Sequence, residues 1–195
     1  MRAVHYRLAA LLLAAWPLFG APETVRPTSI DSVVGYTDCA VGYIDEDPDS
    51  PDSEWCNVAG ANNVDTSVRA SLANPTNPPT STTLAQEIKV WLRKTNHSTN
   101  PTCAVSIREN DVSRFSAGLG AISSTTGVLH TRTWTFDPAE WDDDTGASIE
   151  AQVTCTVGGG NPSNKASGEV GAVEVNLDTA EAPVGFSPQF TIVLQ

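Results

Sequence analysis

Apolar and polar residues alternate along much of this sequence, with the period of a β-strand that buries one face. In the stretch VDTSVRASL, one face collects Val64, Thr66, Val68, Ala70 and Leu72. In the stretch EIKVWLRKT, Ile88, Val90 and Leu92 alternate with Lys89, Trp91 and Arg93. Each pattern predicts a half-buried strand, over 64–72 and 87–95.

The same reasoning predicts five more strands, at Cys103–Ile107, Gly127–Phe136, Ile149–Val157, Val170–Leu177 and Gln189–Leu194. Segments rich in Pro, Asn, Ser, Thr and Gly separate them, and one helical turn is predicted at Asp137–Trp141. Many short strands with hardly any helix are typical of a β-sandwich. We therefore expect an all-β fold, a single jelly-roll-like β-sandwich.

The first twenty residues have the pattern of a secretory signal peptide. Arg2 and Arg7 precede an apolar run that is too short to span a bilayer and that ends in small residues, so we expect cleavage after Gly20. The expected mature chain, 21–195, is one domain that opens with an extended segment at about 21–38. We expect a secreted protein, extracellular or at a cell surface, without membrane insertion.

The net charge of the chain argues against nucleic acid as a partner, and its cysteine count indicates disulfide bonds. Loss of the signal moves the formal charge from −12 to about −14, and such an acidic surface repels nucleic acid. All four cysteines lie in the exported part, which favours two disulfides. Cys103 and Cys155 both fall on the inward face of their strands, so we expect them to pair. The remaining pair, Cys39–Cys56, would enclose an acidic loop.

The order of several segments resembles a poorly characterised module of bacterial surface proteins and phage-encoded structural proteins. The similar elements are IDEDPDSPDSEW, EIKVWLRKT, STTGVLHTRTWTF and EVGAVEVNL, and the resemblance covers about 36–177. It implies a jelly-roll-like fold in a surface or particle setting, and it supplies no catalytic residues. The four cysteines depart from the pattern of that module and suit an exported version.

The acidic stretch YIDEDPDSPDSEWC raises the possibility of a calcium site. Asp45, Asp47 and Asp49 match the first ligand positions of an EF-hand, but Ser50 and Cys56 stand where that loop needs glycine and glutamate. A looser Ca²⁺ site is still open, with Asp142 and Asp144 of a second cluster as further ligands if the fold brings them together. The alternative is a solvated loop closed by a disulfide.

Catalysis finds little support in the sequence. Beyond the signal, the histidines are His97 and His130, and neither lies in a motif with a nucleophile and an orienting group. We therefore expect a protein that is not an enzyme.

Two binding functions remain. Jelly rolls hold sugars on exposed aromatic rings, and the candidates are Trp91, Tyr43 and Trp141, with a surface glycan as partner. The second possibility is self-association: the segment before Cys39 or the C-terminal QFTIVLQ could add a strand to the sheet of a neighbour. We expect a structural or adhesive subunit of an extracellular surface, filament or particle, with a carbohydrate-binding module that holds a structural calcium ion as the alternative.

Overall fold

The computed structural model describes residues 23–58, 63–75, 85–135, 149–159, 161 and 165–177. These residues form nine strands and one short 3-10 helix, η1. The strands are β1 (Glu23–Val25), β2 (Pro27–Val34), β3 (Thr66–Leu72), β4 (Ala85–Lys94), β5 (Thr102–Glu109), β6 (Val112–Ala121), β7 (Val128–Thr135), β8 (Ile149–Thr156) and β9 (Gly168–Leu177), and η1 (Val41–Tyr43) lies between β2 and β3.

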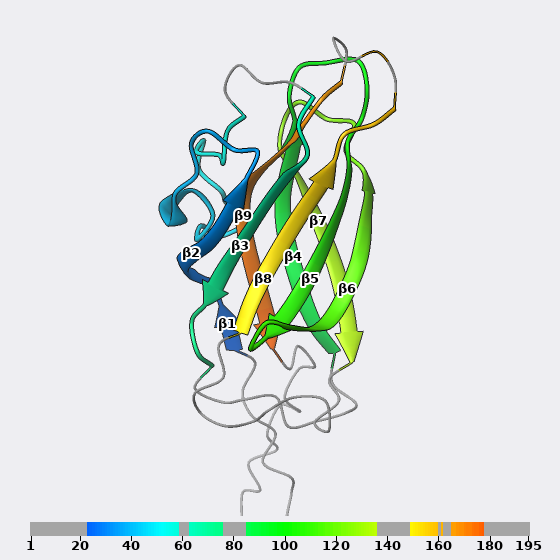
Figure 1. Cartoon of the computed structure of the whole chain (residues 1–195). Helices are drawn as coiled ribbons and strands as arrows, with labels where there is room; N and C mark the ends of the chain where they lie inside the picture. Colours follow the sequence, from blue (N-terminus) through cyan, green and yellow to red (C-terminus); the bar gives the residue numbers. More distant parts are fainter. Residues whose placement is uncertain are drawn as a thin grey trace, which may run out of the picture.

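The strands form two sheets packed face to face (Figure 1). The four-stranded sheet has the order β1-β9-β4-β7, and the five-stranded sheet has the order β2-β3-β8-β5-β6. The antiparallel pairs β1·β9, β3·β8, β4·β7 and β5·β6 are nested, each inside the one before. This is the topology of a jelly roll, a long hairpin rolled into two sheets, with β2 as an extra edge strand.

The inward faces of the strands build the core. Along β3, Thr66, Val68, Ala70 and Leu72 are buried, as the alternation predicts. Cys103 of β5 pairs directly with Cys155 of β8, and the two form a disulfide inside the core. The second disulfide joins Cys39 to Cys56. The predicted fold class and both cysteine pairings are confirmed.

Six predicted strands correspond to β3, β4, β5, β7, β8 and β9, with ends shifted by up to two residues. The extended N-terminal segment forms β1 and β2, which pair with β9 and β3 of the same chain. Strand β6 was not predicted, because its small residues show no alternation. The signal peptide 1–20, the helical turn Asp137–Trp141 and the strand Gln189–Leu194 lie outside the described residues.

The described part contains no helix long and apolar enough to cross a bilayer.

The start of β9 passes very close to the core disulfide. A Cβ atom on Gly168 would lie 2.4 Å from Sγ of Cys155 and 3.2 Å from Sγ of Cys103. We predict that Gly168→Ala lowers the free energy of unfolding by about 2–3 kcal/mol, because a bridged cystine has no free rotamer with which to yield.

Urea denaturation followed by tryptophan fluorescence measures this effect. The matched control is Gly118→Ala in β6, where an added Cβ meets no atom within 4 Å, and its stability should stay within about 0.5 kcal/mol of the wild-type value. Equal losses in the two variants would contradict the packing described for β9.

Candidate functional site

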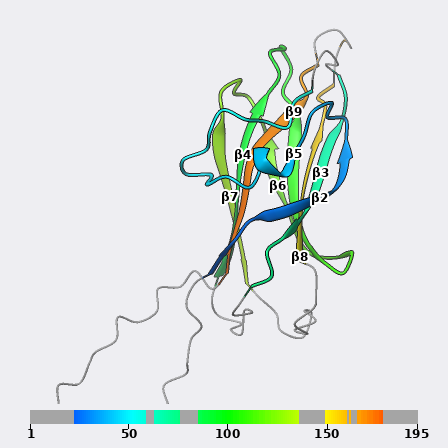
Figure 2. The ribbon, with the colours of Figure 1, turned by 90° about the vertical axis from the view of Figure 1, so that its left-hand side faces the viewer.

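The acidic segment does not project into solvent. It runs between β2 and β3 and pairs with the edge of β9 beyond β1, where Cys56 forms an isolated antiparallel bridge with Val170; Figure 2 shows η1 at the side of the sandwich, between the two sheets. Val173 N–H donates to the carbonyl of Ile44 at 2.9 Å, and Cys56 N–H donates to the carbonyl of Val170 at 2.8 Å. Ile44 is fully buried and belongs to the hydrophobic core of the sandwich. The disulfide closes the segment as predicted, but it closes a layer on the sheet and not a free surface loop.

This layer buries charged side chains of β9. Glu174 is only 4% exposed, and its Oε2 accepts hydrogen bonds from Nε and Nη2 of Arg26 at 2.9 and 2.6 Å. The Asn176 amide donates to the other oxygen at 3.1 Å. A buried carboxylate needs this kind of bidentate partner to offset its desolvation. Arg26 therefore joins the end of β1 to the buried face of β9.

The predicted metal ligands lie close to cations of the protein itself. Asp47 Oδ2 is 3.4 Å from Nη2 of Arg26, and Asp49 accepts from Nζ of Lys89 at 2.5 Å. The hydrogen bond with Asp49 raises the pKa of Lys89 above its ordinary value. These contacts give Asp47 and Asp49 a role in holding the acidic segment against the sheet.

The described residues contain no group of three or more His, Cys, Asp or Glu side chains that could hold a metal ion. Asp142 and Asp144, the other predicted ligands, lie outside the described residues. A calcium site that combines the two acidic clusters therefore stays a prediction.

Trp55 and Trp91 lie together on the outer face of the four-stranded sheet, with ring centroids 6.5 Å apart and planes 29° apart. Trp55 is covered on both sides: its ring packs on the backbone of Gly171, and the guanidinium of Arg93 lies 4.2 Å from its centroid. Arg93 is held there by Glu169, which accepts from Nε at 2.7 Å. Trp91 is half-buried. Only Trp91 of this pair therefore has ring surface available to a ligand.

The other predicted aromatic residues do not extend this surface. Tyr43 packs against the core and its hydroxyl donates to Asp38 Oδ2 at 3.3 Å. The negative charge of Asp38 raises the pKa of Tyr43. The ring contacts within the described residues are Trp55–Trp91 and Phe115–Trp134, so Tyr43 joins no aromatic cluster there. Trp141 lies outside the described residues.

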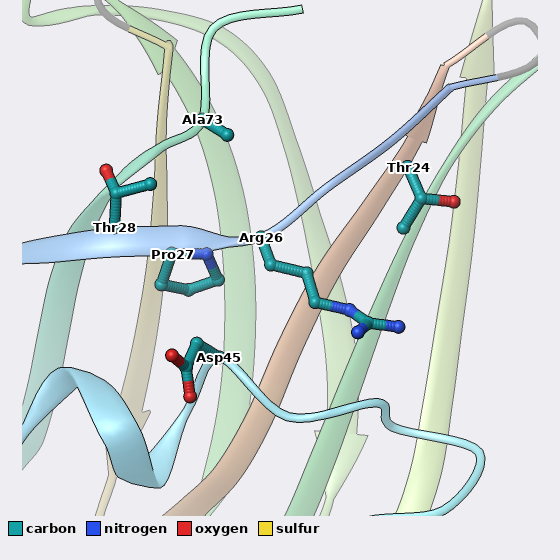
Figure 3. Close-up of a pocket in the computed structure, with 6 residues that line it drawn as sticks. All are labelled: Thr24, Arg26, Pro27, Thr28, Asp45 and Ala73. Atoms are coloured by element: carbon teal, nitrogen blue, oxygen red, sulfur yellow. The ribbon is translucent and has the colours of Figure 1, made fainter.

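Two shallow clefts flank the acidic layer. The first has a volume of about 480 Å³ and is shown in Figure 3. Its lining comes from the β1–β2 junction and from residues that follow η1 and β3, and consists of Thr24, Arg26, Pro27, Thr28, Asp45 and Ala73. The second, of about 390 Å³, lies near the β4–β5 turn and includes Arg93, Lys94, His97 and Glu169. Lys94 already donates to two carbonyls and to Asn100, so its ammonium serves the turn.

The groups that could perform covalent or acid–base chemistry are dispersed or occupied. All four cysteines are in disulfides. His97 lies in the turn after β4, and His130 lies on β7, where burial and then the charge of Arg132 lower its pKa. Within the described part of the chain, nothing combines a nucleophile, a base and an orienting group.

The two outer sides of the sandwich differ in how well they are protected. Strands β6 and β7 are the edges on one side, where Nε of Arg132 donates to the carbonyl of Gly118 at 2.8 Å and Phe115 stacks on Trp134 at 4.7 Å. Strand β2 is the edge on the other side, and in the described part of the chain it pairs only with β3. Val33 and Val34 of β2 are 40% and 58% exposed. In the sequence, the only signal for this exposed edge is the pair of adjacent valines at the end of an extended segment.

No protein-family model matches the chain, and no curated protein matches it either. Among solved structures, the CBM35 of Cellvibrio japonicus Abf62 aligns at 12% identity and a TM-score of 0.41, over 80% of this chain and 92% of that one. A family 35 carbohydrate-binding module from Clostridium thermocellum aligns at 10% identity and a TM-score of 0.38, over 80% of this chain and 98% of that one. A chain of the infectious bursal disease virus Gx strain aligns at 12% identity and a TM-score of 0.35, over 94% of this chain and 39% of that one. At these TM-scores none of the likenesses carries an argument, and the jelly roll is assigned from the nested strand pairs alone.

The Arg26–Glu174 pair generates a prediction. Arg26→Ala should lower the free energy of unfolding by about 3 kcal/mol, because it leaves a buried carboxylate without its bidentate donor. The double variant R26A/E174Q should recover part of this loss, since it removes the charge that needs compensation.

The comparison variant is Asp49→Asn, whose carboxylate is 56% exposed; it should cost less than about 1 kcal/mol, as surface pairs do. Chemical denaturation of the four proteins at pH 7 measures the differences. If Arg26→Ala costs no more than Asp49→Asn, the pair does not anchor the layer.

Proposed function

We propose that this protein is a secreted, non-catalytic structural or adhesive subunit of an extracellular surface, filament or particle, and that it self-associates by strand addition. The observation that carries the proposal is the free edge of β2. This strand is eight residues long, and from Thr28 onward every residue except Ile30 is exposed. An edge of this kind offers unpaired backbone N–H and C=O groups to another strand.

The composition of β2 supports this function. Proteins keep edge strands from pairing with charges, especially lysine, with proline or with β-bulges. Strand β2 has two register shifts against β3, both between Pro27 and Ser32, so its regular stretch is at the Val34 end. In β2 the only charged residue is Asp31, and its carboxylate accepts from the hydroxyl of Ser71 on the neighbouring strand. The two valines at the end of β2 add exposed apolar surface to the free backbone groups.

The disulfides support an oxidising, extracellular setting. Bridges of this kind persist in exported proteins and are rare in reducing compartments. The bridge between Cys103 and Cys155 closes a long loop, with a separation of 52 residues, and contributes about 4 kcal/mol on the chain-entropy model. A subunit that works outside the cell without chaperones gains from such covalent stabilisation.

Size-exclusion chromatography with light scattering tests the proposed function directly. The oxidised mature chain, 21–195, is expected to elute as species larger than a monomer, and their mass should rise with protein concentration. Calcium and a chelator are the two comparison conditions: loss of the assemblies on chelation would assign an ion to the acidic clusters. A monomer under every condition would overturn the self-association proposal.

Carbohydrate binding is the second candidate, and the half-buried Trp91 is the observation that favours it. A sugar ring could stack on the part of the indole that Trp55 and Gly127 leave uncovered. A structural calcium ion at the acidic clusters would belong to this function. The covered faces of Trp55 limit the platform to a single ring, so we expect weak binding.

A glycan array followed by calorimetry tests this candidate. If the chain binds a glycan here, Trp91→Ala should weaken binding at least tenfold, because aromatic stacking contributes the largest apolar contact to a sugar. Tyr43→Phe, which keeps the ring and removes the bond to Asp38, should bind as the wild type does. Equal binding by Trp91→Ala and the wild type would remove Trp91 from the site.

A further inference from the structure

The free edge of β2 could accept another strand, and the geometry of the sheet sets the direction in which that strand would run. Every pair of strands in the described residues is antiparallel, and antiparallel pairing is slightly more stable per residue than parallel pairing. An added strand would run from the level of Val34 toward the level of Pro27. The cleft of Figure 3 lies at that second end of β2 and offers room for a terminal side chain.

The chain itself carries a segment of this composition. Residues Gln189–Leu194, QFTIVL, have no charge and no proline, and they combine β-branched and aromatic residues. A neutral donor suits a chain whose formal charge is −12, because it brings no like charge toward Asp31 of β2. The acidic surface elsewhere would oppose most other contacts between copies.

The position of Leu177 determines how far the segment would have to reach to pair with β2 of its own chain. Leu177 pairs with Glu23, at the start of the β1–β2 run, whereas an antiparallel partner of β2 must begin beside Val34, at the end of that run. The linker of about eleven residues between Leu177 and Gln189 reaches at most about 36–40 Å. The run from Glu23 to Val34 passes from the four-stranded to the five-stranded sheet and contains two register shifts, so its ends are closer together than its extended length. The linker can therefore span this distance, and the experiment below distinguishes pairing within one chain from donation to a second copy.

The other side of the sandwich is the less suitable acceptor. Arg132 caps one carbonyl of the β6 edge, at Gly118, and the Phe115–Trp134 stack closes the gap between β6 and β7. On the other side η1 lies against β2, but the described residues supply no such side-chain cap on the backbone of β2. The difference singles out β2 among the long edge strands.

We propose that the segment Gln189–Leu194 of one copy adds as an antiparallel strand to the β2 edge of the next copy. This inference rests on the proposed self-association and names the two surfaces that make it. Donor and acceptor are different surfaces of the same chain, so the contact is heterologous and head-to-tail. Such contacts extend into a linear assembly unless the rotation between copies closes a ring.

Complementation between two variants of the mature chain tests the proposal. The acceptor variant is V33K/V34K, which places two lysines on the edge of β2. The donor variant is Ile192→Pro, which removes a backbone donor from the middle of the added strand. The matched control is Val112→Lys, because Val112 is 51% exposed on β6, at the opposite edge of the same sheet. Light scattering after size exclusion, at one fixed concentration, reports the mass of each sample.

The expected result is that wild type and Val112→Lys assemble alike, while each of the other two variants alone is a monomer. An equimolar mixture of the two monomeric variants should give a 1:1 dimer, because one retains the donor and the other retains the acceptor. Assembly that survives in V33K/V34K or in Ile192→Pro would overturn the donor–acceptor assignment and leave self-association standing. Loss of assembly in Val112→Lys alone would move the acceptor to β6.

A monomeric wild type would instead contradict the proposed function itself. If the wild type were a monomer and the mixture of the two variants still formed a dimer, Gln189–Leu194 would pair with the β2 edge of its own chain in the wild type. The proposal of donation between copies would then be wrong.

Discussion

The structure depends on β9 being covered on both faces. Its inner face packs on the core, where Gly168 touches the buried disulfide; the segment closed by Cys39–Cys56 pairs with its edge and places Trp55 on its outer face. Eight consecutive residues of β9 are buried as a result, including Glu169 and Glu174. Buried carboxylates require specific cations, and Arg93 and Arg26 are placed to supply them. The acidic segment, the two arginines and the outer tryptophans thus form one layer organised around a single strand.

This layer decides which surfaces remain for function. It covers the edge and outer face of β9 and part of the outer face of β4, and it uses Trp55 as a packing residue between Gly171 and Arg93. The aromatic face that could have formed a broad sugar platform is thereby reduced to Trp91. The β6–β7 side is closed by an arginine and an aromatic stack. At the β2 edge, two neighbouring apolar side chains, Val33 and Val34, are exposed together with backbone groups, whereas β6 and β7 each expose a single valine, Val112 and Val128.

The sequence was sufficient for the fold because strand alternation is a local signal. Ile88, Val90 and Leu92 identify β4 without knowledge of its partners, and inward-facing Cys103 and Cys155 identify their own bridge. Strand β6 gave no such signal, since its small and exposed residues do not alternate. A cue was still present before it: Asn110 and Asp111 both adopt positive φ, as a two-residue hairpin turn requires.

The candidate site was less predictable because it depends on contacts between distant segments. The acidic segment reads as a surface loop by composition, and only the packing of Ile44 and Cys56 on β9 shows that it is a layer. Trp91 and Arg93 were placed correctly on the outer face, but Trp55, which covers it, comes from another segment. Two glutamates within the apolar strand EVGAVEVNL are the signal that could have indicated a second covering layer.

The central claim is that the β2 edge becomes paired when copies of the chain meet, and hydrogen–deuterium exchange of the wild-type mature chain tests it most directly. Measured over a range of protein concentrations, the backbone amides of β2 are expected to become protected as concentration rises, while those of β6 keep a constant exchange rate. Exchange in β2 that is independent of concentration, in samples that light scattering shows to be assembled, would contradict the account.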